Sequence, residues 1–114
     1  MPLRAGTTIA LVTAVESAIE PARELLLEEA AAAGCALRIG SLPAPGAWDL
    51  LELGDHDAYL VAIARHVESI DPSFDVVVLA QASMLGAELL VGASTRPVLV
   101  SPRLAVEQAI QLAG

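Results

Sequence analysis

The clearest structural signal in the chain is the stretch at residues 75–84, which reads DVVVLAQASM. Residues 76–80 form an uninterrupted apolar run that opens with three valines. A short β-branched apolar run of this kind is typical of a strand buried on both faces of a parallel sheet. Gln81 and Ser83 follow it at once, so polar side chains stand at the carboxyl end of the strand. That edge of a parallel sheet is a common place for ligands, which makes these residues candidates for a site.

Three more segments have the pattern of strands. Segments whose apolar residues have the three-four spacing of a helix lie between the strands and after the last one. The strands are expected at 7–13, 35–39, 76–80 and 97–100. The helices are expected at 18–33, 55–70 and 84–91 and from Pro102 onward, with a brief helical turn at 48–53. Ser17 and Asp55 are placed to cap their helices, and Gly34 is placed to end the first one.

The alternation of strands and helices predicts the fold class. It implies an α/β protein in which a parallel sheet with right-handed crossovers has helices on both faces, a three-layer α/β/α arrangement. The strand order that four such strands most simply take is 2-1-3-4. In that order the loops after the first and third strands, residues 13–17 and 81–83, meet at the point where the sheet reverses its direction of growth.

Composition and charge exclude several classes of protein. The length of 114 residues predicts a single domain over residues 1–114. Six basic against fourteen acidic residues give a net charge of -8, which would repel nucleic acid or an anionic membrane surface. No membrane span is expected, because Gln81, Ser83 and Glu88 interrupt the most apolar window, 76–91. The lone Cys35 requires no oxidising compartment, so a cytoplasmic location is the simpler expectation.

The two loops offer groups that bind small anions. Both are expected to lead into helix N-termini, where unpaired N–H groups and the helix dipole favour negative charge. Hydroxyl and amide groups add to them, and a small carboxylate or phosphate is the ligand that this chemistry suits. The expected ligand-binding residues are Thr13, Ser17, Gln81, Ala82 and Ser83. The simpler alternative is that Ser17 and Ser83 only cap their own helices.

Catalysis and metal binding have weaker support in the sequence. No cysteine, histidine or acid lies at 81–83, and a serine nucleophile needs a base within reach, so no catalytic residue is assigned. An enzyme that uses Ser83 or His56 for catalysis is nevertheless one hypothesis. His56 between Asp55 and Asp57 resembles part of a metal site, but a solvated helix start explains the cluster more simply. No cofactor or metal is expected, and His66 is predicted at the surface.

Two other surfaces are predicted from residue spacing. Acidic residues recur every fourth position on the first helix, which is typical of a solvated face, although a basic partner is an alternative. They are Glu16, Glu20, Glu24 and Glu28. The segment 85–93, LGAELLVGA, is more apolar than a solvent-exposed helix requires, which indicates an interface. Cys35 opens a strand and is expected to be a packed, unreactive thiol rather than a nucleophile.

Several segments together resemble the C-terminal half of members of the aspartate/glutamate/hydantoin racemase superfamily. The matching pieces are IALVTAVESAIEPARELL at 9–26, GDHDAYLVAIARHV at 54–67, DVVVLAQASM at 75–84 and PVLVSPRLAVE at 97–107. The resemblance implies two α/β lobes with the active site between them. It also implies that two cysteines, one from each lobe, remove and return the α-proton of an amino acid or related carboxylate.

This chain departs from that pattern at the residues that matter for catalysis. Gln81 stands where the second cysteine of the superfamily would follow the third strand, and Ala18 stands where a threonine would fit. The lobe that would supply the first cysteine is not in the sequence. Glutamine does not exchange a proton near neutral pH, and Cys35 precedes a different strand. The resemblance therefore predicts the ligand scaffold without the two-thiol machinery.

Two functions of different classes are consistent with these features. The first is a racemase-like domain that binds a small carboxylate, such as an amino acid or related acid, without two-cysteine racemase activity of its own. If it were active, it would be an isomerase of the amino-acid racemase type. The alternative is an association module that forms a homodimer, or another homo-oligomer, or pairs with a separately encoded lobe.

Overall fold

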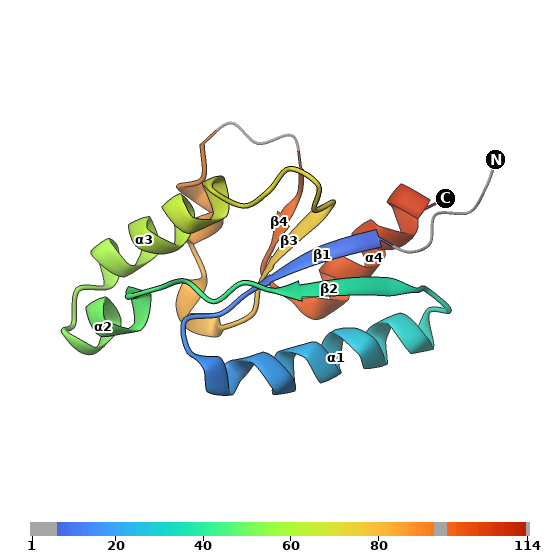
Figure 1. Ribbon diagram of the computed structural model, residues 1–114, viewed down its shortest axis with the longest axis horizontal. Coiled ribbons are helices and arrows are strands. Elements are labelled where there is room, and N and C mark those ends of the chain that lie inside the picture. Colours follow the sequence, from blue (N-terminus) through green and yellow to red (C-terminus); the bar gives the residue numbers. More distant parts are fainter. Residues whose placement is uncertain (1–6, 93–95, 114) are drawn as a thin grey trace.

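The sheet has the predicted strand order. The computed structural model describes residues 7–92 and 96–113, and within them four strands form a parallel sheet of order β2-β1-β3-β4 (Figure 1). The strands are β1 (Thr7–Val12), β2 (Leu37–Ser41), β3 (Val76–Leu79) and β4 (Val98–Leu99). All three pairings are parallel. The expected three-layer α/β/α fold with order 2-1-3-4 is confirmed.

Helices cover both faces of the sheet, but not in the same way. The α-helices are α1 (Ile19–Ala32), α2 (Ala47–Glu52), α3 (His56–Glu68) and α4 (Pro102–Ala113). The 3-10 turns are η1 (Glu16–Ala18), η2 (Ala82–Met84) and η3 (Ala87–Leu89). Figure 1 shows α1 and α4 running along the sheet, whereas α2 and α3 are displaced toward the carboxyl ends of the strands. These two helices therefore stand beside the edge where a site is expected.

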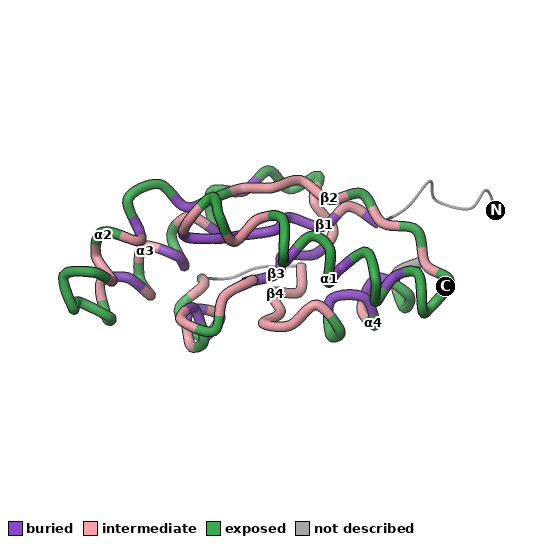
Figure 2. The backbone as a smooth tube through the Cα atoms, turned by 90° about the horizontal axis from the view of Figure 1, so that it is seen from below, coloured by how far each residue is buried: buried purple, intermediate pink, exposed green. Residues whose placement is uncertain are grey.

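The two central strands divide their side chains between two cores. Residues of β1 and β3 alternate strictly, so that successive side chains enter opposite layers. Ile9, Leu11, Val76 and Val78 pack with α1 and α4. Ala10, Val12, Val77 and Leu79 pack with α2, α3 and the η turns. Figure 2 shows buried backbone in the central strands and alternating buried and exposed stretches along α1 and α4.

The turn between α1 and β2 moves the start of β2 two residues beyond its predicted position. Gly34 adopts a φ of 66° just after the helix, where glycine is favoured. The N–H of Cys35 donates to the carbonyl of Ala30 at 2.8 Å, which closes the last helical turn. Cys35 is thus used to end α1. The strand begins only at Leu37, and the prediction of 35–39 was wrong by that amount.

The predicted helix at 84–91 is wrong. The chain forms two separate 3-10 turns there, η2 and η3. Leu85 has an extended ψ of 126°, and Gly86 follows with a φ of 105°, a conformation that interrupts helical hydrogen bonding. The apolar spacing of the segment resembles that of a helix, but its glycine is used for a turn. The loop after β3 consequently leads into a 3-10 turn and not into an α-helix.

Specific polar contacts lie at both ends of α3. Asp55 caps the start of α3 as predicted, its carboxylate accepting from the N–H of Ala58 at 3.1 Å. Beyond the other end of the helix, the guanidinium of Arg96 donates to the carbonyls of Ile70 at 2.8 Å and Asp71 at 2.6 Å. Charged donors stabilise carbonyl groups left unpaired after a helix end. The Arg96 contacts join the connection between α3 and β3 to the segment that leads into β4.

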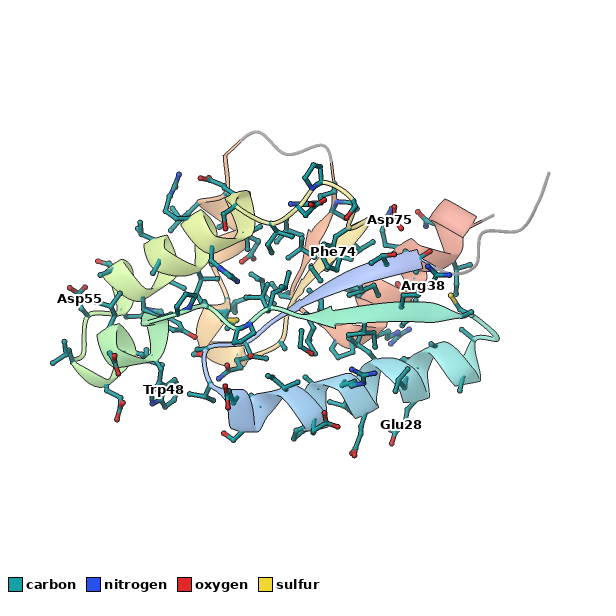
Figure 3. All side chains as sticks on the ribbon, in the orientation of Figure 1. Glu28, Arg38, Trp48, Asp55, Phe74 and Asp75 are labelled. Carbon is teal, nitrogen blue, oxygen red and sulfur yellow. The ribbon has the colours of Figure 1, made fainter. Side chains whose placement is uncertain are left out.

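A close contact lies between β2 and the residue that leads into β3. The ring of Phe74 lies over the sheet (Figure 3), and a Cβ atom added at Gly40 would stand 2.7 Å from its Cε1 atom. That distance is shorter than van der Waals contact allows. Gly40 is therefore required by the close approach of the ring and not by its backbone conformation, because its φ is not in the left-handed region.

Candidate functional site

The loops after β1 and β3 meet, as the strand order predicts. The backbone N–H of Ala14 donates a hydrogen bond of 2.6 Å to the side-chain oxygen Oε1 of Gln81. Ala14 lies two residues beyond the end of β1, and Gln81 lies two residues beyond the end of β3. Since β1 and β3 are adjacent and parallel, their carboxyl ends share one edge. A half-buried glutamine side chain thus bridges the place where a ligand is expected.

Thr13 lies within this edge and holds a buried hydroxyl without a partner. The residue is 0% exposed, and among the described residues its Oγ1 atom has no hydrogen-bond partner. Its backbone carbonyl accepts from the N–H of Ala44 at 2.7 Å. Leaving a buried hydroxyl unpaired costs about 1–3 kcal/mol, so each such group in a folded protein calls for an explanation.

A third loop therefore belongs to the site, and sequence reasoning missed it. After β2 ends, Leu42 and Ala44 continue to donate from their backbones to the carbonyls of Leu11 and Thr13. Ala44 is buried in this position. The Pro- and Gly-rich composition of residues 41–47 indicates a loop, but its pairing with the end of β1 depends on tertiary structure that no local signal encodes.

Ser17 and Ala82 are less enclosed than the other predicted ligand residues. Both are exposed. Ser17 lies in η1, and the residue that caps α1 is Ala18, with no side-chain hydrogen bond to the cap. The prediction that Ser17 caps α1 is therefore wrong, because η1 precedes the helix and moves its start to Ile19. Within the described chain, no hydrogen bond joins Ser17 to Gln81 or Ser83.

Ser83 is held by the first turns of α3. Its Oγ lies 2.8 Å from the phenol oxygen of Tyr59, and its carbonyl oxygen lies 3.2 Å from Nε2 of His56. The rings of His56 and Tyr59 stack with centroids 6.1 Å apart. Their spacing of three residues puts both on one side of α3. The sequence shows that spacing, but no local signal indicates that the two side chains contact Ser83.

The geometry around Ser83 does not form a nucleophile with its base. Burial raises the pKa of Tyr59, and the hydrogen bond between its hydroxyl and that of Ser83 offsets part of that rise, so the phenol is neutral at neutral pH. His56 meets the carbonyl oxygen of Ser83 and not its hydroxyl. A carbonyl oxygen only accepts, so Nε2 of His56 serves as a donor in this contact. The Ser83 hydroxyl therefore lacks the adjacent base that nucleophilic catalysis needs.

The remaining titratable candidates lie in other surroundings. His66 is half-buried and its Nε2 lies 2.9 Å from the carbonyl of Leu42, which corrects the prediction of a surface histidine. Cys35 is a free, half-buried thiol before β2. In residues 7–92 and 96–113, no three His, Cys, Asp or Glu side chains gather as a metal site would require. Over the same ranges, no helix has both the length and the apolar character needed to cross a membrane.

We predict that Tyr59→Phe lowers the free energy of unfolding by about 0.5–1.5 kcal/mol, the usual net value of one hydrogen bond. The raised pKa of Tyr59 adds a dependence on pH. The stability that this raised pKa contributes is fully present below the pKa of an unfolded tyrosine, about 10. It is lost as pH rises through the higher pKa of Tyr59 in the folded protein. Urea unfolding between pH 8 and pH 11 measures both effects. An equal alkaline loss of stability in wild type and variant would contradict the assignment.

The predicted apolar and acidic surfaces are both exposed. Leu85, Leu89 and Leu90 form the η3 apolar surface, with exposed fractions of 62%, 83% and 41%. Ala93, the last residue of the predicted segment, lies outside the described residues. The four glutamates of the acidic row are exposed along η1 and α1, and Glu28 points away from the sheet (Figure 3).

The fold and the edge geometry define a class, an open parallel α/β protein with polar loops at the carboxyl ends of its central strands. Comparisons with protein-family models, with curated proteins and with solved structures found no match.

Proposed function

We propose that this protein is a racemase-like α/β domain that binds a small carboxylate at the loops after β1 and β3. The observation that carries the proposal is the meeting of the Thr13–Ala14 backbone with Gln81 beside the buried, unpartnered hydroxyl of Thr13. A carboxylate oxygen accepts hydrogen bonds from N–H and O–H groups. The N–H of Ala14 and the hydroxyls of Thr13 and Ser83 are therefore suitable donors. The segments that resemble the racemase superfamily include all three.

Two-thiol racemisation is not part of the proposal. Gln81 stands where the resemblance calls for a thiol, and its carboxamide is too weak a base and too weak an acid to transfer an α-proton near neutral pH. Cys35 precedes β2, so in a parallel sheet it belongs to the edge opposite the carboxyl ends that carry Thr13 and Gln81. We expect no deuterium incorporation from solvent at the α-carbon of aspartate or glutamate. Incorporation by the purified chain would contradict this part of the proposal and would indicate an isomerase.

Amide NMR tests the binding site directly. Wild-type protein is titrated with aspartate, glutamate and malonate, and with malonamide as a control in which amides replace both carboxylates of malonate. We expect shifts of the backbone amides at 13–18 and 81–84 with the acids only. Thr13→Val keeps the shape of the side chain but removes the hydroxyl, and we expect it to bind more weakly. Its stability should be unchanged or higher by about 1 kcal/mol, since the hydroxyl is unpaired. Unmoved loop amides would refute the proposal.

The exposed η3 apolar surface favours a second candidate function, association of the chain with a copy of itself. Large exposed leucines clustered within one segment are typical of protein interfaces. Apolar surface removed from water contributes about 25 cal/mol per Å², so burial of such leucines supplies a driving force. The alternative occupant of the same surface is a separately encoded lobe, and a test must distinguish it from a second copy of the chain.

We predict that the wild type is a dimer at low micromolar concentration and that Leu89→Glu makes it monomeric, as measured by sedimentation velocity. Leu53 supplies a matched control, because it is 81% exposed, close to the 83% of Leu89, but lies at the end of α2. Leu53→Glu should leave the dimer intact. A monomeric, folded wild type would rule out a second copy as the occupant and leave a separate lobe as the candidate to examine.

A further inference from the structure

The contact between Gln81 and Ala14 resembles the contact that a bound carboxylate would make. A carboxamide oxygen and a carboxylate oxygen are both planar acceptors, and each would receive the N–H of Ala14 along the same line. At 2.6 Å the two atoms are within hydrogen-bonding distance. The donor most suited to an incoming carboxylate is therefore already used by a side chain of the same protein.

We infer that Gln81 acts as an internal substitute for the ligand, occupying the carboxylate position on Ala14 until a ligand displaces it. This inference rests on the proposed carboxylate site and names the residue that sets its affinity. Thr13 precedes Ala14 in the chain, and its buried hydroxyl has no partner among the described residues, so the contact with Gln81 leaves that donor unsatisfied. A carboxylate has two oxygens on one carbon and so brings a second acceptor that the bridging Gln81 oxygen does not supply.

Charge gives the ligand its advantage over the glutamine. Hydrogen bonds to an ionised acceptor are roughly twice as strong as those between neutral groups, so a carboxylate gains more from Ala14 than the carboxamide does. The glutamine gains from being tethered, since a group attached to the chain competes at a high effective concentration. The net affinity for the ligand therefore depends on how far the stronger hydrogen bond of the carboxylate exceeds the advantage that tethering gives to the glutamine.

Substitutions of Gln81 separate this role from that of a structural bridge. Gln81→Ala removes the competitor, and acetate or malonate should bind about tenfold more tightly, the factor that corresponds to one net hydrogen bond. Gln81→Glu places a tethered carboxylate on the same donor, and binding should fall at least tenfold. Gln111→Glu adds the same charge at an exposed position on α4 and should bind like wild type. Affinities are measured by amide NMR at constant ionic strength, with chloride as the control salt.

Each outcome of this comparison decides a question. If wild type binds and Gln81→Ala binds equally or more weakly, the inference is overturned and the proposed function stands. If only Gln81→Ala binds, the inference is supported and the proposed function of the natural chain is overturned. If no variant binds acetate or malonate, both are overturned.

A measurement on the wild type keeps the inference testable if Gln81→Ala does not fold. During titration with malonate, the side-chain NH₂ signals of Gln81 and the backbone amide of Ala14 should shift with the same midpoint, because one event displaces the oxygen and replaces it. If the Ala14 amide shifts while the Gln81 signals stay in place, the glutamine is not displaced and the inference is wrong.

Discussion

Leu26→Ala is expected to lower the free energy of unfolding by about 2–5 kcal/mol, the range for truncating a buried leucine. Leu26 is 0% exposed and lies on the face of α1 that packs against Ile9 and Leu11 of β1. Truncation removes apolar contact with the sheet and leaves a cavity, because a strand on one side and a helix backbone on the other limit the collapse of the gap. Equilibrium unfolding in urea measures the change.

The neighbouring residue provides the control for that experiment. Leu25 is in the same helix and loses the same atoms on substitution, but it is 52% exposed. Leu25→Ala should therefore change stability by much less, within about 0.5 kcal/mol, the usual range for surface substitutions. Similar losses for both variants would mean that the described face of α1 is not the one that meets the sheet.

Gly40→Ala is expected to lower the free energy of unfolding by about 1–3 kcal/mol, the usual result of forcing an extra methyl group into a packed site. The added Cβ would lie 2.7 Å from Cε1 of Phe74, and the ring must move to admit it. In a strand, alanine is otherwise better tolerated than glycine, so a destabilisation identifies the steric contact as its cause. Urea unfolding of the single variant gives the magnitude.

A double-mutant cycle isolates that contact. Phe74→Leu removes the ring atoms that approach Gly40, so Gly40→Ala should cost less in that background than in wild type. The difference between the two costs is the interaction energy between the added methyl group and the ring. Additive effects of the two substitutions would show that the loss in Gly40→Ala has another origin.

Much of the fold could be predicted from local sequence signals. The apolar run at 76–80 and the alternation of strand-like and helical segments along the chain predict the parallel sheet. The order 2-1-3-4 follows from common topology. The division of successive side chains of β1 and β3 between two opposite cores follows from the pleat. The strands, the helices and the division of side chains between two cores depend on periodicity within short segments, which the sequence displays directly.

The segment after β3 shows the limit of periodicity. Residues 84–91 carry helical apolar spacing, but Gly86 turns the chain and splits the segment into η2 and η3. A glycine within a helical pattern signals either tolerance or a break, and only the tertiary environment decides between them. Here Met84 and Ala87 are buried in the core, which holds the broken segment in place.

The candidate site could be predicted in position but not in detail. Strand order brings Thr13 and Gln81 to one edge, and their contact through Ala14 agrees with that expectation. Tyr59 and His56 were not expected there, because they lie more than twenty residues from Ser83 in the chain and meet it only through tertiary packing. Long-range contacts of this type depend on how α3 docks, which no single segment specifies.

The two edges of the sheet bear on how this chain avoids aggregation. β4 has two residues paired with β3, so it offers few unpaired backbone groups to a strand from another molecule. At the opposite edge, β2 carries the exposed, charged Arg38 (Figure 3). Short edge strands and edge charges both discourage the joining of sheets between molecules. Association of this chain, where it occurs, should therefore proceed through side-chain packing and not by continuing the sheet from one copy into the next.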